Sequence, residues 1–245
     1  MTLAHRCELK YLVSERIAQA VRDAAAPHIQ PDEHSVTQPH DGYPVCSLYL
    51  DSPDWLLFRH TTEGRQQRFK LRVRLYDDQP NSPVFCEIKH RHGQGIVKQR
   101  VLVSRAAVDE ALLGRVCRYS ELLSSGCVND TDCADVWREF WRLRDQLNAV
   151  GRLYVIYKRE AYVGRHEPQV RVTFDRQLVG SPFRVGEPLQ VPTTGVAPPV
   201  RGVVLELKFD TRFPHWMHQI VQRFQLERAS MPKYVECVRA CGLLR

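Results

Sequence analysis

Several short segments of the chain alternate charged and apolar residues with a period of two. In residues 70–74, Lys70, Arg72 and Arg74 are basic, and Leu71 and Val73 between them are apolar. Successive side chains of a strand point to opposite faces, so this alternation predicts a strand with one charged and one apolar face. The pattern recurs at 87–89, 98–100, 171–175 and 206–208. If these faces converge, they line a cavity with cations and a few carboxylates, which suits a ligand with many phosphate groups.

The hydrophobic pattern predicts one α+β domain over residues 1–245. Ser14 and Ser104 are expected to cap helices, and Ser52-Pro53 is expected to begin a short helix. Residues 30–44, rich in His, Pro and Asp, and 180–202, rich in Pro and Gly, are expected loops. Strands are expected at 6–13, 45–50, 66–77, 84–90, 96–103, 153–163, 169–178 and 203–209, and helices at 15–26, 52–61, 105–113, 115–149, 214–224 and 233–241.

Composition narrows the class of partner. Hydrophobic residues make up 43% of the 245, enough for a core, and the formal net charge of +7 favours an anionic partner such as a nucleotide, nucleic acid, polyphosphate or membrane surface. The eight Cys form no Cys-x-x-Cys pair, which disfavours zinc and fits a reduced cytosolic protein. No signal peptide or apolar run of about 20 residues is found, so we expect a soluble cytoplasmic protein, with recruitment by a separate membrane protein left open.

The charged faces have two explanations. A solvated face of an antiparallel sheet also alternates, and for any single strand that explanation is sufficient. Across the strands, however, basic residues dominate, and like charges on neighbouring strands are unfavourable without a counter-anion. We therefore expect a phosphate-rich ligand, which Arg grips with a planar fork and Lys with a point charge. The residues that carry this expectation are Arg72, Arg74, Lys89, Lys98, Arg100, Arg159 and Arg171.

The acids between these cations also have two explanations. Polyphosphates travel with Mg²⁺ or Mn²⁺, and Glu8 or Glu206 could hold such an ion within the basic cavity. Alternatively, Glu8, Glu87 and Glu206 form salt bridges with neighbouring Arg and Lys, and for Glu87 we favour this second explanation. No nucleophilic Ser or Cys motif and no P-loop is present.

In their order and spacing, these segments resemble the VTC domain, the polyphosphate polymerase domain of the vacuolar transporter chaperone complex, within the triphosphate tunnel metalloenzymes. The resemblance runs over nearly the whole chain. Its motifs are residues 6–11 (RCELKY), 47–51 (SLYLD), 70–74 (KLRVR), 87–89 (EIK), 97–100 (VKQR), 157–159 (YKR), 171–175 (RVTFD), 206–208 (ELK) and 232–234 (PKY).

The resemblance implies an antiparallel eight-stranded β-barrel, the triphosphate tunnel, with helices packed outside. It implies that Glu206 binds Mn²⁺ or Mg²⁺ and that Tyr157 belongs to the substrate site. Arg100, Lys208 and Glu8 lie in the same charged pattern and are expected to bind substrate. The catalytic cations that it implies are Lys10, Arg72, Arg74, Lys89, Lys98, Arg159, Arg171 and Lys233.

The function implied is a polyphosphate polymerase that transfers the γ-phosphoryl group of ATP to a growing inorganic polyphosphate chain and releases ADP. Hydrolysis of a triphosphate or NTP on the same fold is the first alternative. Relatives that hydrolyse triphosphates usually begin Glu-x-Glu-x-Lys, and Arg6 in place of the first acid favours the polymerase. Pro232 stands where the family often has Ser. The second alternative is a non-catalytic module that binds polyphosphate or nucleic acid, although the basic strands carry few aromatic residues for nucleic acid.

Overall fold

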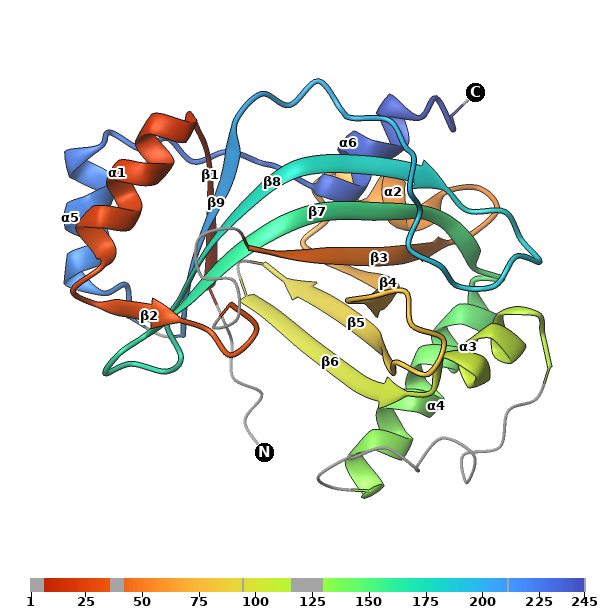
Figure 1. The fold of residues 1–245 in the computed structure, drawn as a ribbon. Helices are drawn as coiled ribbons and strands as arrows, with labels where there is room; N and C mark the ends of the chain where they lie inside the picture. The colour runs from red at the N-terminus through yellow and green to blue at the C-terminus, as the bar shows by residue number, and fades with distance from the viewer. Residues whose placement is uncertain (1–6, 36–41, 94, 116–129, 211, 245) are drawn as a thin grey trace.

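The computed structural model describes residues 7–35, 42–93, 95–115, 130–210 and 212–244. These residues form nine strands and six helices (Figure 1). The strands are β1 (Cys7–Val13), β2 (Ile29–Pro31), β3 (Tyr43–Asp51), β4 (Gln67–Leu75), β5 (Val84–His92), β6 (Gly95–Val103), β7 (Val150–Gly164), β8 (Arg171–Pro182) and β9 (Val203–Phe209). The helices are α1 (Glu15–Ala25), α2 (Leu56–Thr62), α3 (Arg105–Leu112), α4 (Asp130–Gln146), α5 (His215–Arg223) and α6 (Lys233–Ala240).

All strands belong to one antiparallel sheet, which confirms the predicted fold class. Eight of them follow the order β1-β9-β8-β7-β3-β4-β5-β6, and short β2 pairs with β7. The sheet curls strongly, so that its two edge strands approach each other (Figure 1). Within the described residues no backbone ladder joins β1 to β6. An ion pair between Glu8 of β1 and Lys89 of β5, 3.0 Å long, spans the gap instead.

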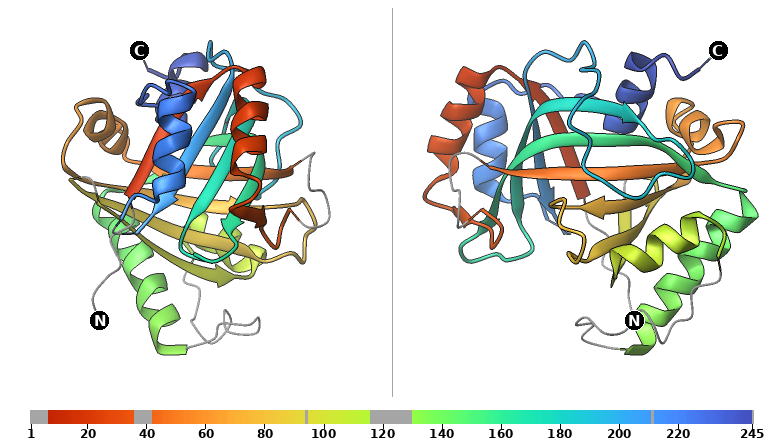
Figure 2. Two further views of the ribbon diagram at one scale, coloured as in Figure 1. Left: turned by 90° about the vertical axis from the view of Figure 1, so that its left-hand side faces the viewer. Right: turned by 45° about the vertical axis from the view of Figure 1, so that its right-hand side comes forward.

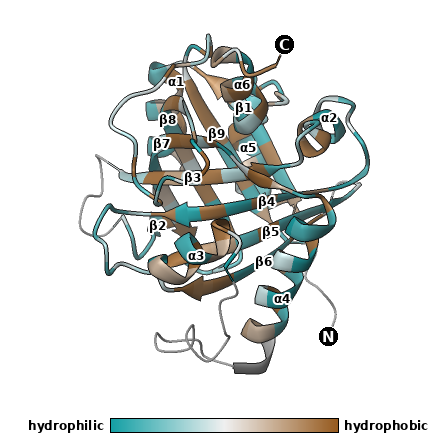
Figure 3. Ribbon diagram, turned by 90° about the vertical axis from the view of Figure 1, so that its right-hand side faces the viewer, coloured by the Kyte–Doolittle hydropathy of each residue, from teal (hydrophilic) through white to brown (hydrophobic). Residues whose placement is uncertain are grey.

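The alternating residues face the two sides of this curl as predicted. Leu71 and Val73 are fully buried under the outer helices, whereas Arg72 and Arg74 line a cavity on the concave side. In the antiparallel register, Lys70 lies opposite Lys89. Hydrophilic and hydrophobic residues alternate along β4 and β5 (Figure 3). The period-two pattern therefore separates an outer hydrophobic core from an inner charged surface.

Two outer cores hold the sheet in its curled form. Helices α3 and α4 cover β4, β5 and β6, with Trp137 and Phe140 packed against Val101 and Ile88. Helices α1 and α5 lie side by side over β1, β8 and β9 (Figure 2, left). These four helices thus bury their apolar stripes on the convex face and leave the concave face to polar groups.

Helix α6 is the exception, since it packs on the concave face. Its Val235 and Val238 join a core with Leu153 and Val155 of β7, on the same face as the cavity residue Tyr157. Gly180 of β8 makes this close approach feasible. A Cβ atom there would lie only 2.8 Å from the Cβ of Cys237. The missing side chain lets α6 enter the curl and carry its first residue, Lys233, to the cavity.

The segment boundaries differ from the predictions in two informative places. The expected loop at 30–44 contains β2, which pairs with β7 and tolerates Pro31 because it is short. The helix expected from Ser52 begins at Leu56 instead. Ser52 Oγ accepts the backbone N–H of Leu56 at 2.9 Å, and the carboxylate of Asp51 accepts those of Leu57 and Phe58 at 2.8 and 2.9 Å, so the two side chains share the helix start.

Two other expectations concern cysteine and the membrane. Of the eight Cys, those at 117 and 127 lie outside the described residues, and the six described ones form no disulfide with one another. Burial raises the pKa of Cys46 to about 12, as expected for a small hydrophobe in a core. Among the helices of the described residues, none is long and apolar enough to cross a membrane.

Candidate functional site

A cavity of about 860 Å³ occupies the concave side of the sheet. Fourteen Lys and Arg side chains line it, against five carboxylates, so its surface carries a large excess of positive charge. All thirteen residues singled out from the sequence line this one cavity: Glu8, Lys10, Arg72, Arg74, Lys89, Lys98, Arg100, Tyr157, Arg159, Arg171, Glu206, Lys208 and Lys233. The structure thus brings them together, while their individual roles stay predictions.

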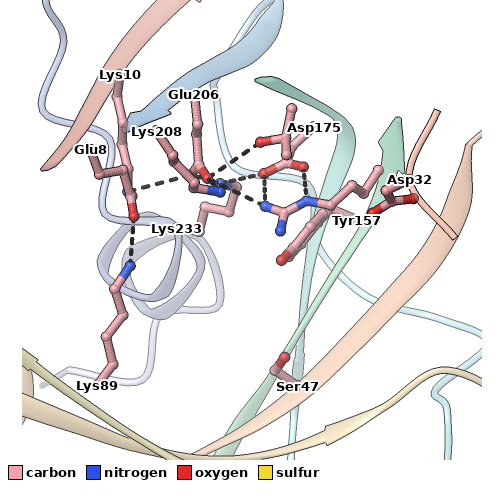
Figure 4. Close-up of polar contacts among 12 residues, drawn as sticks. Glu8, Lys10, Asp32, Ser47, Lys89, Tyr157, Asp175, Glu206, Lys208 and Lys233 are labelled. Atoms are coloured by element: carbon pink, nitrogen blue, oxygen red, sulfur yellow. Dashed lines mark hydrogen bonds and ion pairs between the residues drawn. The ribbon is translucent and has the colours of Figure 1, made fainter. Parts of the chain in front are cut away.

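Glu206 is the centre of the first ion cluster. Its carboxylate lies 2.6 Å from Lys208 Nζ, 2.8 Å from Lys233 Nζ, 3.5 Å from Lys10 Nζ and 3.4 Å from Arg159 (Figure 4). Burial alone would raise the pKa of Glu206, but Lys208, Lys233 and Lys10 hold it well below its usual range. Glu206 is therefore an anion that offsets four surrounding cations.

Asp175 joins this cluster and was not singled out from the sequence. It forms a two-pronged ion pair with Arg159, at 2.6 and 2.7 Å, and lies 2.7 Å from Lys233 Nζ (Figure 4). Burial opposes its ionisation, but Arg159 and Lys233 keep its pKa below the usual value. Because Asp175 ends the alternating segment 171–175 and lies opposite Arg159 in register, the pattern contained the signal.

Glu87 is the centre of the second ion cluster, on the opposite wall. Its carboxylate lies 2.6 Å from Arg72 Nε, 2.5 Å from Lys98 Nζ and 3.8 Å from Arg74 Nε. This confirms the salt bridges expected for Glu87, which is fully buried behind the cations. Arg72 also donates a hydrogen bond of 3.0 Å to the hydroxyl of Tyr49. The carboxylate holds the three cations in place while they face the cavity.

Lys70 is a second residue that the sequence analysis did not select. It lines the cavity beside Lys89 and forms no ion pair with any carboxylate of the described residues. Burial lowers its pKa well below the usual range, and the nearby Lys10 and Lys89 lower it further. Lys70 thus has like-charged neighbours and no carboxylate partner, while Lys89 beside it pairs with Glu8; such a lysine is unfavourable without a nearby anion, so this wall points to an anionic ligand.

Three of the predicted residues are exposed: Lys98, which pairs with Glu87, and Arg100 and Arg171. Arg171 is exposed and lies opposite Lys208 in register, and Arg100 is exposed with its guanidinium 4.9 Å from the ring of Phe85. Of the two departures from the family pattern, Arg6 lies outside the described residues. Pro232 lines the cavity directly before α6, with Ser230 nearby in the same wall.

The acids fit a divalent ion only in part. Among the described residues, no three His, Cys, Asp or Glu side chains gather to hold a metal. Glu206 pairs with four of the cations that line the cavity, and its carboxylate can supply at most two oxygen ligands to a metal ion. Magnesium commonly binds through one or two carboxylates with substrate phosphates as its further ligands. The donor set thus fits an ion shared with a bound polyphosphate, with Glu206 as the protein's ligand.

We predict that anion affinity falls as pH rises. Burial lowers the pKa of Lys208 to about 8 and that of Lys98 to about 7, although Glu206 and Glu87 act in the opposite direction. An amine is charged below its pKa, so binding a polyphosphate above pH 8 requires proton uptake. The affinity for inorganic tripolyphosphate should fall by up to about tenfold per pH unit for each such lysine between pH 7 and 9.5. Calorimetry in metal-free buffer at several pH values measures this affinity. Lys208→Met should make the affinity depend less steeply on pH than in the wild type; equal pH dependence in both proteins would contradict the prediction.

Comparison with known proteins gives a family match and two solved structures of low similarity. The family model described as the VTC domain matches residues 5–241. A solved structure from Bacillus halodurans, provisionally described as an adenylate cyclase, aligns with a TM-score of 0.49 at 15% identity over 93% of each chain. A second, from Vibrio parahaemolyticus and described in the same way, has a TM-score of 0.43 at 12% identity over 93% of this chain and 94% of that one. No curated protein matches the sequence.

The family match covers the curled sheet, both ion clusters and the helix that delivers Lys233. It leaves out only the first four residues and the last four. The chain therefore belongs to the VTC domain family.

Proposed function

We propose that this protein is a polyphosphate polymerase that uses ATP. The observation that carries the proposal is the cavity itself, in which fourteen cations face five carboxylates around a volume of about 860 Å³. A ligand that neutralises such an excess must carry many negative charges in an elongated, flexible form. Triphosphates and inorganic polyphosphate have this character, and the family match supports the same ligand class.

In the proposed reaction, an oxygen of the terminal phosphate of the growing chain attacks the γ-phosphorus of ATP. The bond between that phosphorus and the β,γ-bridging oxygen breaks, and ADP leaves with the bond's electron pair. The attacking oxygen is already anionic, so no strong general base is needed. Phosphoryl transfer depends on positioning and charge neutralisation, which a site rich in Arg and Lys provides.

The two ion clusters have complementary tasks in this scheme. Arg72, Arg74 and Lys98 would clamp phosphates from one wall, each already aligned by Glu87. Arg159 and Lys233 would do so from the other wall, aligned by Asp175. Lys10, Lys89 and Arg171 would neutralise the remaining phosphates along the cavity.

Glu206 would hold a divalent ion together with phosphate oxygens. Enzymes with the tunnel fold generally depend on such an ion. When bound, Mg²⁺ or Mn²⁺ would neutralise charge on the β- and γ-phosphates. Lys10 and Lys208, which pair with Glu206 in the ligand-free structure, would then turn to the phosphates.

The decisive assay incubates the purified protein with ATP and Mn²⁺. We expect ADP and long-chain polyphosphate, the latter resolved by gel electrophoresis. One ADP should be released for each phosphate unit that enters the polymer. Release of free phosphate in place of polymer would assign the site to hydrolysis. Tight binding of polyphosphate without any ADP would assign it to a binding module. Either outcome, across varied pH and primer, would contradict the polymerase proposal.

A further inference from the structure

An aromatic cluster lies at one end of the cavity, and neither ion cluster uses it. It consists of His34, Tyr43 and Tyr76, and all three line the cavity. The ring of His34 stacks on Tyr76 with centroids 5.3 Å apart and lies 5.5 Å from Tyr43. Half of the His34 side chain is exposed, so one face of this stack is open to a ligand.

The cluster lies next to phosphate-binding cations. Tyr43 is opposite Arg159 in the register of β3 and β7. Tyr76 follows β4 directly, two residues after Arg74, which places the two about 7 Å apart along the strand. A ligand whose phosphates lie between Arg74 and Arg159 therefore has its non-phosphate end within reach of these rings.

Asp32 adds a hydrogen-bond acceptor at the same place. It is buried and lines the cavity. Its Oδ1 accepts the backbone N–H of Ser35 at 2.9 Å, whereas Oδ2 accepts only a long hydrogen bond of 3.4 Å from the hydroxyl of Tyr43. This second oxygen retains the capacity to accept a hydrogen bond from a ligand hydroxyl or amino group.

Toward the start of β4, away from Tyr76, the cavity wall has neither the aromatic cluster nor Asp32. From Arg74, the inner face continues through Arg72 and Lys70 to Arg68, all cations that line the cavity. The cavity is thus asymmetric: an aromatic and acidic end that suits a nucleoside, and an end with a run of cations along β4 that suits phosphate, where Glu8 pairs with the neighbouring Lys89. A polyphosphate chain offers nothing for the aromatic end to recognise.

We infer that the cluster of His34, Tyr43 and Tyr76, with Asp32, is the nucleoside subsite for the ATP of the proposed reaction. The base stacks on the open face of His34, and Asp32 accepts a hydrogen bond from the nucleoside. The triphosphate then runs past Arg74 toward Arg72 and Lys70, so the growing chain extends over the cationic end. The inference rests on the proposed function, since it names the orientation of that substrate.

The test compares ATP with inorganic tripolyphosphate, which has the same phosphates and no base. Affinities are measured by calorimetry in metal-free buffer for the wild type, His34→Ala and Tyr76→Leu. Stacking on an aromatic ring contributes enough for a loss of about tenfold in ATP affinity, while tripolyphosphate affinity should stay within about twofold. His28→Ala is the matched control, because His28 also stacks on an aromatic ring, Trp216 at 4.9 Å, but does not line the cavity.

Each other outcome overturns the inference. If the variants lose equal affinity for ATP and for tripolyphosphate, the rings only shape the cavity. If their ATP affinity is unchanged, no base binds there. In both cases wild-type turnover would still support the polymerase. A wild-type protein that binds neither ligand would overturn the proposed function and the subsite together.

Discussion

Replacing Arg72 with Met is expected to lower polyphosphate synthesis by about a hundredfold or more. Loss of one preorganised group that stabilises developing charge typically has an effect of this size. The same change removes the 2.6 Å ion pair between Arg72 and fully buried Glu87, which then keeps Lys98 at 2.5 Å and Arg74 at 3.8 Å. Removing the single partner of a buried charge destabilises a protein by about 3 kcal/mol, so with two partners left the free energy of unfolding should fall by less than that.

A second substitution separates these two effects. In Arg72→Met/Glu87→Gln, the buried negative charge is gone, but Arg74 and Lys98 lose the carboxylate that paired with them, so we expect only part of the lost stability to return. Turnover should stay low because the phosphate contact is still missing. Arg138→Met is the surface control. Arg138 lies on the exposed side of α4, where it pairs with Asp135, and this variant should match the wild type in both turnover and stability. Recovery of turnover in the double variant would mean that Arg72 acts only through stability.

Glu206→Gln is expected to change binding and turnover in opposite directions. Glu206 offsets Lys10, Lys208, Lys233 and Arg159, so its neutralisation should raise metal-free affinity for tripolyphosphate by about tenfold. Turnover with Mn²⁺ should fall by about a hundredfold or more, because the proposed metal ligand is weakened. Calorimetry and the ADP assay measure the two quantities on the same preparation.

Glu160→Gln is the matched control for this experiment. Glu160 is equally buried and is held by Arg22 and Arg176, but it lies outside the cavity on the convex side. We expect a loss of stability and no change in anion affinity or turnover. If Glu206→Gln behaves like Glu160→Gln, then Glu206 serves only to hold the fold together.

The site was more predictable than the element boundaries. The period-two alternation together with the resemblance to the VTC domain identified thirteen residues that line one cavity, and for those on strands the side-chain direction follows from backbone geometry alone. Lys70 and Asp175 belong to the same pattern and were passed over, since a pattern does not show which charges end up with partners. The start of α2 was misplaced because Trp55, with a φ of 60°, interrupts the chain before Leu56, and because Asp51, which accepts backbone N–H groups of the first turn, is itself held by a hydrogen bond of 2.9 Å from the hydroxyl of distant Tyr234.

Other features depend on contacts between segments far apart in the chain. The aromatic cluster joins His34, Tyr43 and Tyr76 from three segments, none of which is notable by itself. The entry of α6 into the curl depends on the absence of a side chain at Gly180, opposite Cys237. The local secondary-structure propensity of a segment carries no information about such long-range contacts.

The sequence by itself determined the class of the site: strands with a cationic face, arranged in the order of the VTC domain family. The alternation of charged and apolar residues is a local property of the sequence, and the number of charges is known without the fold. Only the tertiary structure decided which carboxylate holds which cations and which end of the cavity is aromatic. These outcomes depend on register, curl and helix docking, and thus on how distant parts of the chain pack together.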